Sequence, residues 1–538
     1  MTRPLARPRL HSAALAVALL AAPAALPAQR EIVDRATLQK IQEEGFQRSR
    51  AMTTVSWLAD VYGPRLTGGP EIREAAEWAK KQLADYGLSN IREERFPFGR
   101  GWSLVHFSAS MVEPRVMPIV GMPKAWTRGT EGPVTADVVL APVATRADLE
   151  RHRGQLRGKI VLTQPEREVR MLEERIVLRM NEEEVREAER APAPTPRPAA
   201  PGPRAQASAE QRLSADEIRD FYVAEGAVAL IDRGSDATVV NGGSDLSWET
   251  QRTDGGTVFV GGGGSRSDSV GTGLPAVTIA VEHYNRMVRI LEKGLPVRME
   301  LDVRTRFHEE RDGQGGFNIL AEIPGTDPKL RDEVVILGAH FDSWHGATGA
   351  TDNATGVTAM MEAMRILKAI GAKPRRTIRL ALWGGEEQGL LGSRAYARAH
   401  LGDPRTGERK PGWEKFAGYF NLDNGTGRIR GVWLEGNDAA GPIFRQWMEP
   451  LAPLGVTIVG PRTVGSTDHA AFTALGLPGF QFVQERLEYR SRTHHSTMDF
   501  VDRVQPDDLM QQAVVAASFA YLTAMRDEPL PRTEVGAR

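Results

Sequence analysis

The residues best suited to chemistry in this chain are histidines and carboxylates in its second half. In chain order they are His340, Asp342, Asp352, Glu386, Glu387, Asp423 and His495. Such residues are typical of a hydrolytic site with two divalent metal ions, which can clamp a water and polarise a carbonyl group. Each ion needs about three protein ligands and an open position. The chain contains no cysteine, so the ligands of any metal ion must come from His, Asp and Glu.

Short apolar runs that are typical of strands precede most of these residues. His340 follows the run 333–339, the Glu386-Glu387 pair follows the run 377–383, and Asp423 follows the run 418–422. In an open α/β sheet, ligands bind beyond the carboxyl ends of the strands. We therefore expect these side chains to converge at one edge of a sheet.

The spacing also suggests how the work is divided among the carboxylates. Asp352 lies in a loop that opens a helix and is the natural bridge between two ions, because a carboxylate has two oxygens. Adjacent glutamates point different ways, so one of Glu386 and Glu387 can bind metal while the other moves the proton of the water. Asp342 is placed to orient His340, as a carboxylate often does. Taken singly, each motif is more often a hydrogen-bonded pair, a solvated face or a turn; their joint order is what favours a site.

The pattern of elements predicts an α/β fold with a second, β-rich part. From residue 315 onward strands and helices alternate, including helices at 353–369, 389–400 and 506–525, which predicts a mostly parallel central sheet with helices on both faces. Residues 33–96 are expected to form helices around a loop at 63–70. Between these parts, short β-type runs separated by turns occupy about 113–163 and 219–305.

A compositionally odd stretch interrupts the β-rich part. Residues 166–190 carry dense alternating charge and could form a solvated helix. Residues 191–209 are rich in Pro and Ala, a composition that cannot bury a core and favours an extended linker. Ser214 and Glu217 have the spacing of a capping box that opens the next helix.

The first residues have the pattern of an export signal. Arg3, Arg7 and Arg9 precede a short apolar stretch, and Ala28 offers a small residue for cleavage, so residues 1–28 are predicted to be a signal peptide. No other apolar run approaches the roughly 20 residues of a membrane span. The net charge of -1 gives no reason to expect nucleic acid as a partner. We expect an exported protein, periplasmic or extracellular, and infer no oligomeric state.

Several of these segments resemble the co-catalytic di-zinc exopeptidases, a family that includes bacterial leucyl aminopeptidases, plasma glutamate carboxypeptidase and the transferrin-receptor ectodomain. The segments that carry the resemblance are 340–343 (His-Phe-Asp-Ser), 349–356, 386–393 and 466–469 (Ser-Thr-Asp-His), together with the loop 63–68. The resemblance implies a peptidase domain made of residues 33–114 and 306–527. It also implies an inserted protease-associated domain at 115–305, with a Pro/Ala-rich insertion at about 166–212.

The resemblance also implies roles for the candidate residues and two zinc ions as cofactors. One zinc would be held by His340, Asp352 and Asp423, and the other by Asp352, Glu387 and His495. Glu386 would be the general base, Asp342 would hold His340, and the Asp352-Asn353 peptide bond would be cis. The family places its histidine ligand four residues before an aspartate, so Asp499 selects His495 over His494. His469 and His345 are expected near the site, in supporting or structural roles.

The implied activity is hydrolysis of terminal bonds in peptides, and the sequence favours an aminopeptidase over a carboxypeptidase. Arg486, Arg490 and Arg492 keep the second option open, because a carboxypeptidase needs a cationic group for the terminal carboxylate. Two other classes share the fold: a non-catalytic receptor-like protein, which would lack ligands, and a glutaminyl-cyclase-like transferase, which would use one zinc. The complete ligand set argues against both.

Overall fold

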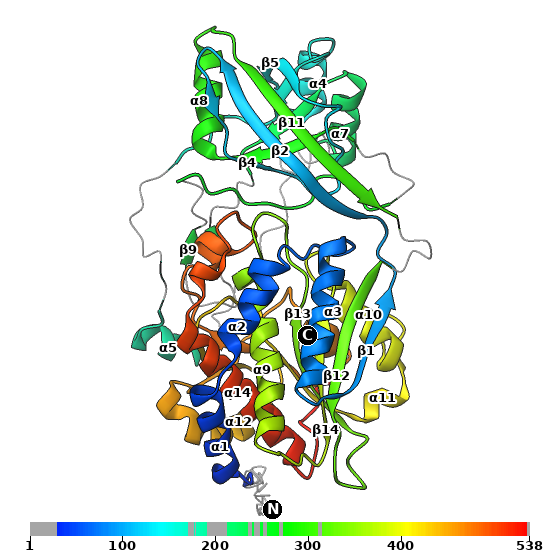
Figure 1. Cartoon of the computed structure of the whole chain (residues 1–538), viewed down its shortest axis with the longest axis vertical. Helices are drawn as coiled ribbons and strands as arrows, with labels where there is room; N and C mark the ends of the chain where they lie inside the picture. The colour runs from blue at the N-terminus through cyan, green and yellow to red at the C-terminus, as the bar shows by residue number, and fades with distance from the viewer. Residues whose placement is uncertain are drawn as a thin grey trace, which may run out of the picture.

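The structure is a computed structural model that describes residues 30–169, 177, 179–190, 212–234, 239–241, 248–250, 255–267, 273–309 and 315–534. The segment predicted to be a signal peptide and most of the Pro/Ala-rich stretch lie outside these residues. Two sheets, each with its own helices, form two units that stack along the long axis of the molecule (Figure 1). We call the lower one, made of residues 30–96 and 315–534, the peptidase unit after the segments in it that resemble peptidases, and the upper one, whose sheet lies within residues 101–308, the second unit.

The sheet of the peptidase unit has a parallel centre. Its strands, in spatial order, are β1 (Ser89–Phe96), β12 (Gly316–Ile323), β14 (Thr377–Trp383), β13 (Val334–His340), β17 (Phe416–Asn421), β20 (Gly479–Gln484), β18 (Ile429–Trp433) and β19 (Ile458–Gly460). The pairs β14–β13, β13–β17 and β17–β20 are parallel. The pairs β1–β12, β12–β14 and β18–β20 are antiparallel. The predicted mostly parallel central sheet is thus confirmed for the strands that carry the candidate site.

Helices cover both faces of this sheet, as predicted. The helices are α1 (Arg35–Gln47), α2 (Ala51–Ser56), α3 (Pro70–Asp85), α9 (Thr355–Ala369), α10 (Leu391–His400), α11 (Pro411–Glu414), α12 (Gly441–Met448), α13 (Ala470–Thr473) and α14 (Pro506–Met525). Successive residues of a strand point to opposite faces. In β13, Val335 and Leu337 therefore join the core beneath α9 and α14, whereas Ile336 joins a second core beneath α10 and α13.

Shorter turns of helix complete the peptidase unit: η1 (Trp57–Val61), η2 (Ala350–Ala354), η3 (Asp438–Ala440), η4 (Glu449–Leu454), η5 (Tyr489–Thr493) and η6 (Val501–Arg503). A small hairpin joins β15 (Gly402–Asp403) to β16 (Glu408–Arg409). Within the larger core, one ion triad is buried: the Arg365 guanidinium lies 2.6 Å from Glu44 and 2.8 Å from Glu362. This triad fastens α1 to α9.

The second unit contains an eight-stranded sheet whose long strands reach toward the peptidase unit (Figure 1). Its order is β3 (Met117–Pro118), β2 (Gly101–Glu113), β11 (Arg298–His308), β5 (Val134–Leu140), β6 (Ile160–Leu162), β7 (Ala229–Asp232), β10 (Ala276–Ile279) and β4 (Gly121–Pro123). Its helices are α4 (Arg146–His152), α7 (Ala215–Ala224) and α8 (Val281–Glu292), and β8 (Val239–Asn241) pairs with β9 (Trp248–Thr250). Ser214 caps α7 through the predicted capping box. The sheet spans 101–308, a wider range than the expected 115–305.

The charged stretch near 166–190 differs from the solvated helix that its composition favours. Within its described residues, helix is confined to α5 (Glu182–Ala188), and Ala188 is buried against Trp433 and Ile458 of the peptidase unit. Arg179 pairs with Glu485 at 2.6 Å and also with Asp508. The charges therefore pair with acidic groups of another unit, which a local pattern does not reveal.

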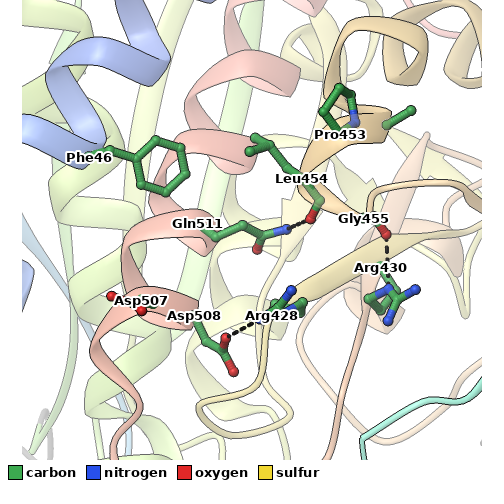
Figure 2. Close-up of a pocket in the computed structure, with 10 residues that line it drawn as sticks. Phe46, Arg428, Arg430, Pro453, Leu454, Gly455, Asp507, Asp508 and Gln511 are labelled. Atoms are coloured by element: carbon green, nitrogen blue, oxygen red, sulfur yellow. Dashed lines mark hydrogen bonds and ion pairs between the residues drawn. The ribbon is translucent and has the colours of Figure 1, made fainter.

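A groove of about 380 Å³ lies beside these ion pairs, lined by residues of η4, β18 and α14 (Figure 2). Arg428 pairs with Asp508 at 3.3 Å, and Arg430 donates to the carbonyl of Gly455 at 2.9 Å. The arginines that line the groove thus serve to hold β18 against α14 and η4. Among the described residues, no helix is both long enough and apolar enough to cross a membrane.

Candidate metal centre

The candidate ligands converge where three neighbouring parallel strands end. His340 is the last residue of β13, Asp423 comes just after β17, and the pair Glu386-Glu387 follows β14. Since these strands are adjacent in the order β14–β13–β17, their carboxyl ends lie at one edge of the sheet. The sequence-based expectation about this edge is therefore confirmed by the strand order.

Asp352 lies between two groups of candidate ligands and offers one carboxylate oxygen to each. On one side, the Nε2 atom of His340 is 3.3 Å from Asp352 Oδ1 and 3.3 Å from Asp423 Oδ1. On the other side, the Nε2 atom of His495 is 3.4 Å from Asp352 Oδ2 and 2.8 Å from Glu387 Oε2. The peptide bond from Asp352 to Asn353 is cis, as the resemblance implies.

The two adjacent histidines occupy different places in this arrangement. Their rings stack with centroids 3.7 Å apart, and the Nε2 atom of His494 lies 3.9 Å from Asp352 Oδ2. Of the two, His495 makes the contact with Glu387. Burial and the neighbouring positive charge of His495 hold the pKa of His494 well below its usual value. The contact with Glu387 thus favours His495 as the ligand, while the His494 ring stacks on it and also lies near Asp352.

Asp342 contacts both His340 and the glutamate pair. The Nδ1 atom of His340 bonds the main-chain carbonyl of Asp342 at 3.0 Å, while the Asp342 carboxylate lies 3.7 Å away. That carboxylate accepts the backbone N–H groups of Glu386 at 3.2 Å and Glu387 at 3.4 Å. Asp342 therefore fixes the His340 ring through its main chain and the glutamate pair through its side chain.

Burial and neighbouring charges shift the pKa values of several side chains in the site. Burial is the largest influence on Asp423 and acts to raise its pKa, but the charge and hydrogen bond of His340, with the hydrogen bond of Thr467 and the charge of Arg490, together lower the pKa to about 2. Burial likewise acts to lower the pKa of His495, but the charge and hydrogen bond of Glu387, together with the charge of Asp352, raise it to about 9. For Glu386, burial raises the pKa well above its usual value against the opposing charge of His340. Such a concentration of acidic groups calls for positive charge at the centre.

The donor set fits two zinc ions. Imidazole nitrogen and carboxylate oxygen are ordinary zinc ligands. Among the described residues, the buried atoms Asp352 Oδ2 and Glu387 Oε1 have no hydrogen-bond partner. Since a buried charged oxygen without a partner is costly, both atoms are well suited to ligate a cation. The ligand atoms of His340, Asp352 and Glu387 all lie within 4.8 Å of one another.

Two further residues brace the site, and sequence reasoning did not assign their roles. Asp499 accepts the backbone N–H groups of Thr351 at 2.6 Å and Asp352 at 3.1 Å, which fixes the backbone at Asp352. The buried Arg65 guanidinium donates to four main-chain carbonyls, among them those of Phe341 and Gly349, both at 2.9 Å. It thereby ties together the two ends of the loop that joins β13 to η2. The only signals were the loop 63–68 and the spacing of Asp499 from His495.

The other histidines named from the sequence prove structural. His469 bonds the carbonyl of Val464 at 2.7 Å through Nε2. His345 donates from Nε2 to the carbonyl of Pro123 at 2.7 Å, which joins the peptidase unit to the second unit. Burial lowers the pKa of His345 to about 4. Neither ring is therefore directed to a metal position.

The matches to known proteins agree with this geometry. Residues 318–520 match the model of peptidase family M28. Carboxypeptidase Q of Mus musculus is 27% identical over 507 residues, which cover 94% of this chain and 90% of the relative. The chain superposes on a peptidase M28 precursor from Shewanella amazonensis with a TM-score of 0.65 at 24% identity, covering 93% of this chain and 98% of the other. It superposes on an aminopeptidase from Aneurinibacillus sp. strain AM-1 with a TM-score of 0.53 at 20% identity, covering 92% of this chain and 98% of the other. Residues 318–520 are therefore similar to peptidase family M28, and the chain as a whole is similar to carboxypeptidase Q in sequence and to these two peptidases in fold.

Proposed function

We propose that the chain is a zinc exopeptidase with His340, Asp352 and Asp423 at one zinc and Asp352, Glu387 and His495 at the other. One observation carries this assignment: the Asp352 carboxylate lies between the two groups, with Oδ1 toward His340 and Oδ2 toward His495. A bridging carboxylate is what two close cations require, because its charge offsets their repulsion.

In this proposal the glutamate that binds no metal moves the proton. When bound, the two zinc ions polarise the attacking water and the scissile carbonyl and stabilise the oxyanion that forms. Glu386 takes a proton from the water and later hands it to the leaving nitrogen. The two backbone bonds to the Asp342 carboxylate hold Glu386 and Glu387 in fixed relation, so the base keeps its position while its neighbour serves as ligand.

We further propose that the enzyme recognises the carboxyl end of its substrate. The sequence alone favours the amino end, but two arginines beside the metal centre support the other choice. Arg490 is close enough to act on the pKa of both Asp423 and His495. Arg486 is buried, and burial together with the charge of Arg490 lowers its pKa well below the usual value. Guanidinium groups bind carboxylates through paired hydrogen bonds, so this corner suits a terminal carboxylate.

The relatives give independent support for the carboxyl end. A sequence match that covers 94% of the chain is named carboxypeptidase Q. A relative named as a probable leucine aminopeptidase is also 27% identical, but this match covers only 38% of the chain.

A panel of blocked dipeptides separates the alternatives. Enzyme with its zinc content measured should hydrolyse a free dipeptide and its N-acetyl form, and should act poorly on the dipeptide amide. Preference for the amide over the N-acetyl form would refute the carboxyl-end proposal in favour of an aminopeptidase. A single zinc per chain without any hydrolysis would instead favour a cyclase-like transferase.

An arginine variant tests the recognition group itself. Arg490→Gln should raise KM for the free and N-acetyl dipeptides about tenfold or more, because a charge-assisted contact contributes roughly 1.5–3 kcal/mol. The matched control is Arg405→Gln, which removes an exposed arginine of the β15–β16 hairpin that pairs with Asp403. An unchanged KM in Arg490→Gln would remove the structural basis of the carboxylate site.

We also propose that the second unit is a protease-associated domain inserted into the peptidase domain, and that the chain is exported. The β-rich second unit, which falls between β1 and β12, supports the first statement. The residue pattern of 1–28 supports the second. Amino-terminal sequencing of protein recovered outside the cytoplasm should begin just after Ala28; an intact start in all of the protein would contradict export by cleavage.

A further inference from the structure

A loop of the second unit, residues 255–267, crosses to the metal centre. On one side it is fixed to its own unit: the Ala125 N–H donates to the Gly261 carbonyl at 3.1 Å, and the Gly263 N–H donates to the Ala125 carbonyl at 3.0 Å. There is no room for a side chain at Gly264, since a Cβ would lie 1.6 Å from the Trp126 carbonyl oxygen. The loop is thus held at a defined place above the peptidase unit.

On its other side the loop pairs with the backbone around His495. The Val260 N–H donates to the His495 carbonyl at 2.7 Å, and the Thr497 N–H donates to the Val258 carbonyl at 2.9 Å. The Val258 N–H donates to the Thr497 hydroxyl at 3.1 Å. Together with the bridge between Phe259 and Ser496, these bonds make a short antiparallel ladder across the two units.

His495 has a conformation that needs such support. Its φ angle is +56°, in the left-handed region that a residue with a side chain rarely adopts. Backbone strain of this kind persists where surrounding contacts over-determine it. The ladder fixes the carbonyl of His495, while the ring of Trp344 lies edge-on to its imidazole at 6.1 Å.

Side chains of the loop add a packed contact on the same side. Val258 is 1% exposed, Val260 is 9% exposed, and both pack with Trp344. The Val260 side chain lies so close to Gly346 that a Cβ there would meet it at 2.6 Å. The loop after β13 and the His495 loop are therefore both in contact with one short segment of the second unit.

We propose that Val258–Val260 is a positioning element of the second zinc site, so that the second unit completes the metal centre by holding His495. The proposal rests on the proposed function, because it takes His495 as a zinc ligand. Nothing in it requires the segment to touch substrate. It predicts that breaking the ladder weakens one zinc and leaves the other in place.

The test measures zinc in the full chain with two ladder variants. Val260→Pro removes the N–H that the His495 carbonyl accepts, and Thr497→Val removes the acceptor of the Val258 N–H with little change of shape. At a fixed free zinc concentration where the unaltered enzyme holds two ions, Val260→Pro should hold about one. In chelator competition, Thr497→Val should weaken the second zinc roughly 10-fold, within the range for groups that orient metal ligands.

Two controls make the outcome decisive. Thr305→Val removes a hydroxyl bond to the Thr127 carbonyl inside the second unit, at 3.3 Å, and should keep both ions at their normal affinity. His495→Ala should lose one ion. If both ladder variants bind two ions normally while His495→Ala binds one, the positioning proposal is refuted and the ligand assignment stands. If His495→Ala also binds two ions, the assignment fails and the positioning proposal fails with it. In the cobalt-substituted ladder variants, the visible absorption of one of the two bound ions should change while that of the other stays as in the unaltered protein.

Discussion

Replacing Glu386 by glutamine is the sharpest test of the division of labour in the metal centre. The substitution keeps the shape of the side chain and the backbone bond of residue 386 to Asp342. It removes the basic carboxylate but none of the proposed zinc ligands. The variant should therefore bind two zinc ions and should lose most of its turnover.

The expected size of the loss follows from the role of the group. A positioned general base typically contributes a factor of about 10² to 10⁴ in rate, which corresponds to about 3–5 kcal/mol in the activation free energy. KM should change little, because the two ions and the arginine corner remain. The matched variant Glu387→Gln alters a proposed ligand 2.8 Å from His495 and should instead lose zinc.

The metal-free proteins give a second readout that does not depend on turnover. Burial raises the pKa of Glu386 well above its usual value, so the folded state resists losing this proton. Above the usual carboxyl pKa, the unfolded chain releases the proton more readily, and stability therefore falls as pH rises. Glutamine has no proton to release, so metal-free Glu386→Gln should lose less stability between pH 5 and pH 8 than the unaltered protein does.

The assays are zinc analysis by mass spectrometry, dipeptide hydrolysis followed by chromatography, and melting of chelator-treated protein at the two pH values. Turnover within a few-fold of normal in a variant that holds both ions would refute the base assignment. Loss of zinc from Glu386→Gln would show instead that Glu386 is a ligand.

Three further predictions concern the ligands, the junction of the units and the core. His495→Ala should lower zinc to about one ion per chain, whereas His494→Ala should keep two; the reverse result in metal analysis would exchange their roles. The pKa of His345 is lowered to about 4 in the fold from 6.5, so its neutral form stabilises the fold above pH 6.5 and this contribution is lost as pH falls toward 4. On acidification to pH 5, the free energy of unfolding of His345→Gln should therefore fall less than that of the unaltered protein, by on the order of 2 kcal/mol. Urea denaturation of the metal-free proteins measures this difference, and equal losses in both would contradict the prediction. Arg365→Met leaves two buried carboxylates without their partner and should destabilise the fold by about 3–5 kcal/mol in urea, with a loss below 1 kcal/mol counting against a role for the triad.

Much of the peptidase fold could be predicted because its signals are local. The run 377–383 coincides with β14, and the helix expected at 506–525 coincides with α14. Buried parallel strands are continuous apolar runs, so their bounds are visible in the chain. The convergence of His340, Asp423 and the glutamate pair followed from a rule about strand ends.

What could not be predicted depends on contacts between distant segments. Arg65 stands in a loop whose residues suggest only a turn, yet it bonds carbonyls more than 270 positions away. The ladder at Val258–Val260 lies beside a run of four glycines, and nothing in the composition of that stretch indicates a partner. The segment around Arg179 shows the same limit, because the acidic partners of its charge belong to another unit. The bonding partner of a backbone amide or a guanidinium group cannot be read from any periodic pattern in the sequence.

The position of α14 has a consequence for how the enzyme is made. This helix is buried along almost its whole length against α9, and it follows every proposed ligand in chain order. While the polypeptide emerges from the ribosome, one face of the catalytic sheet must stay uncovered until the last helix has been synthesised. The covering of the sheet that carries the proposed ligands is therefore completed only after all of those ligands have been synthesised.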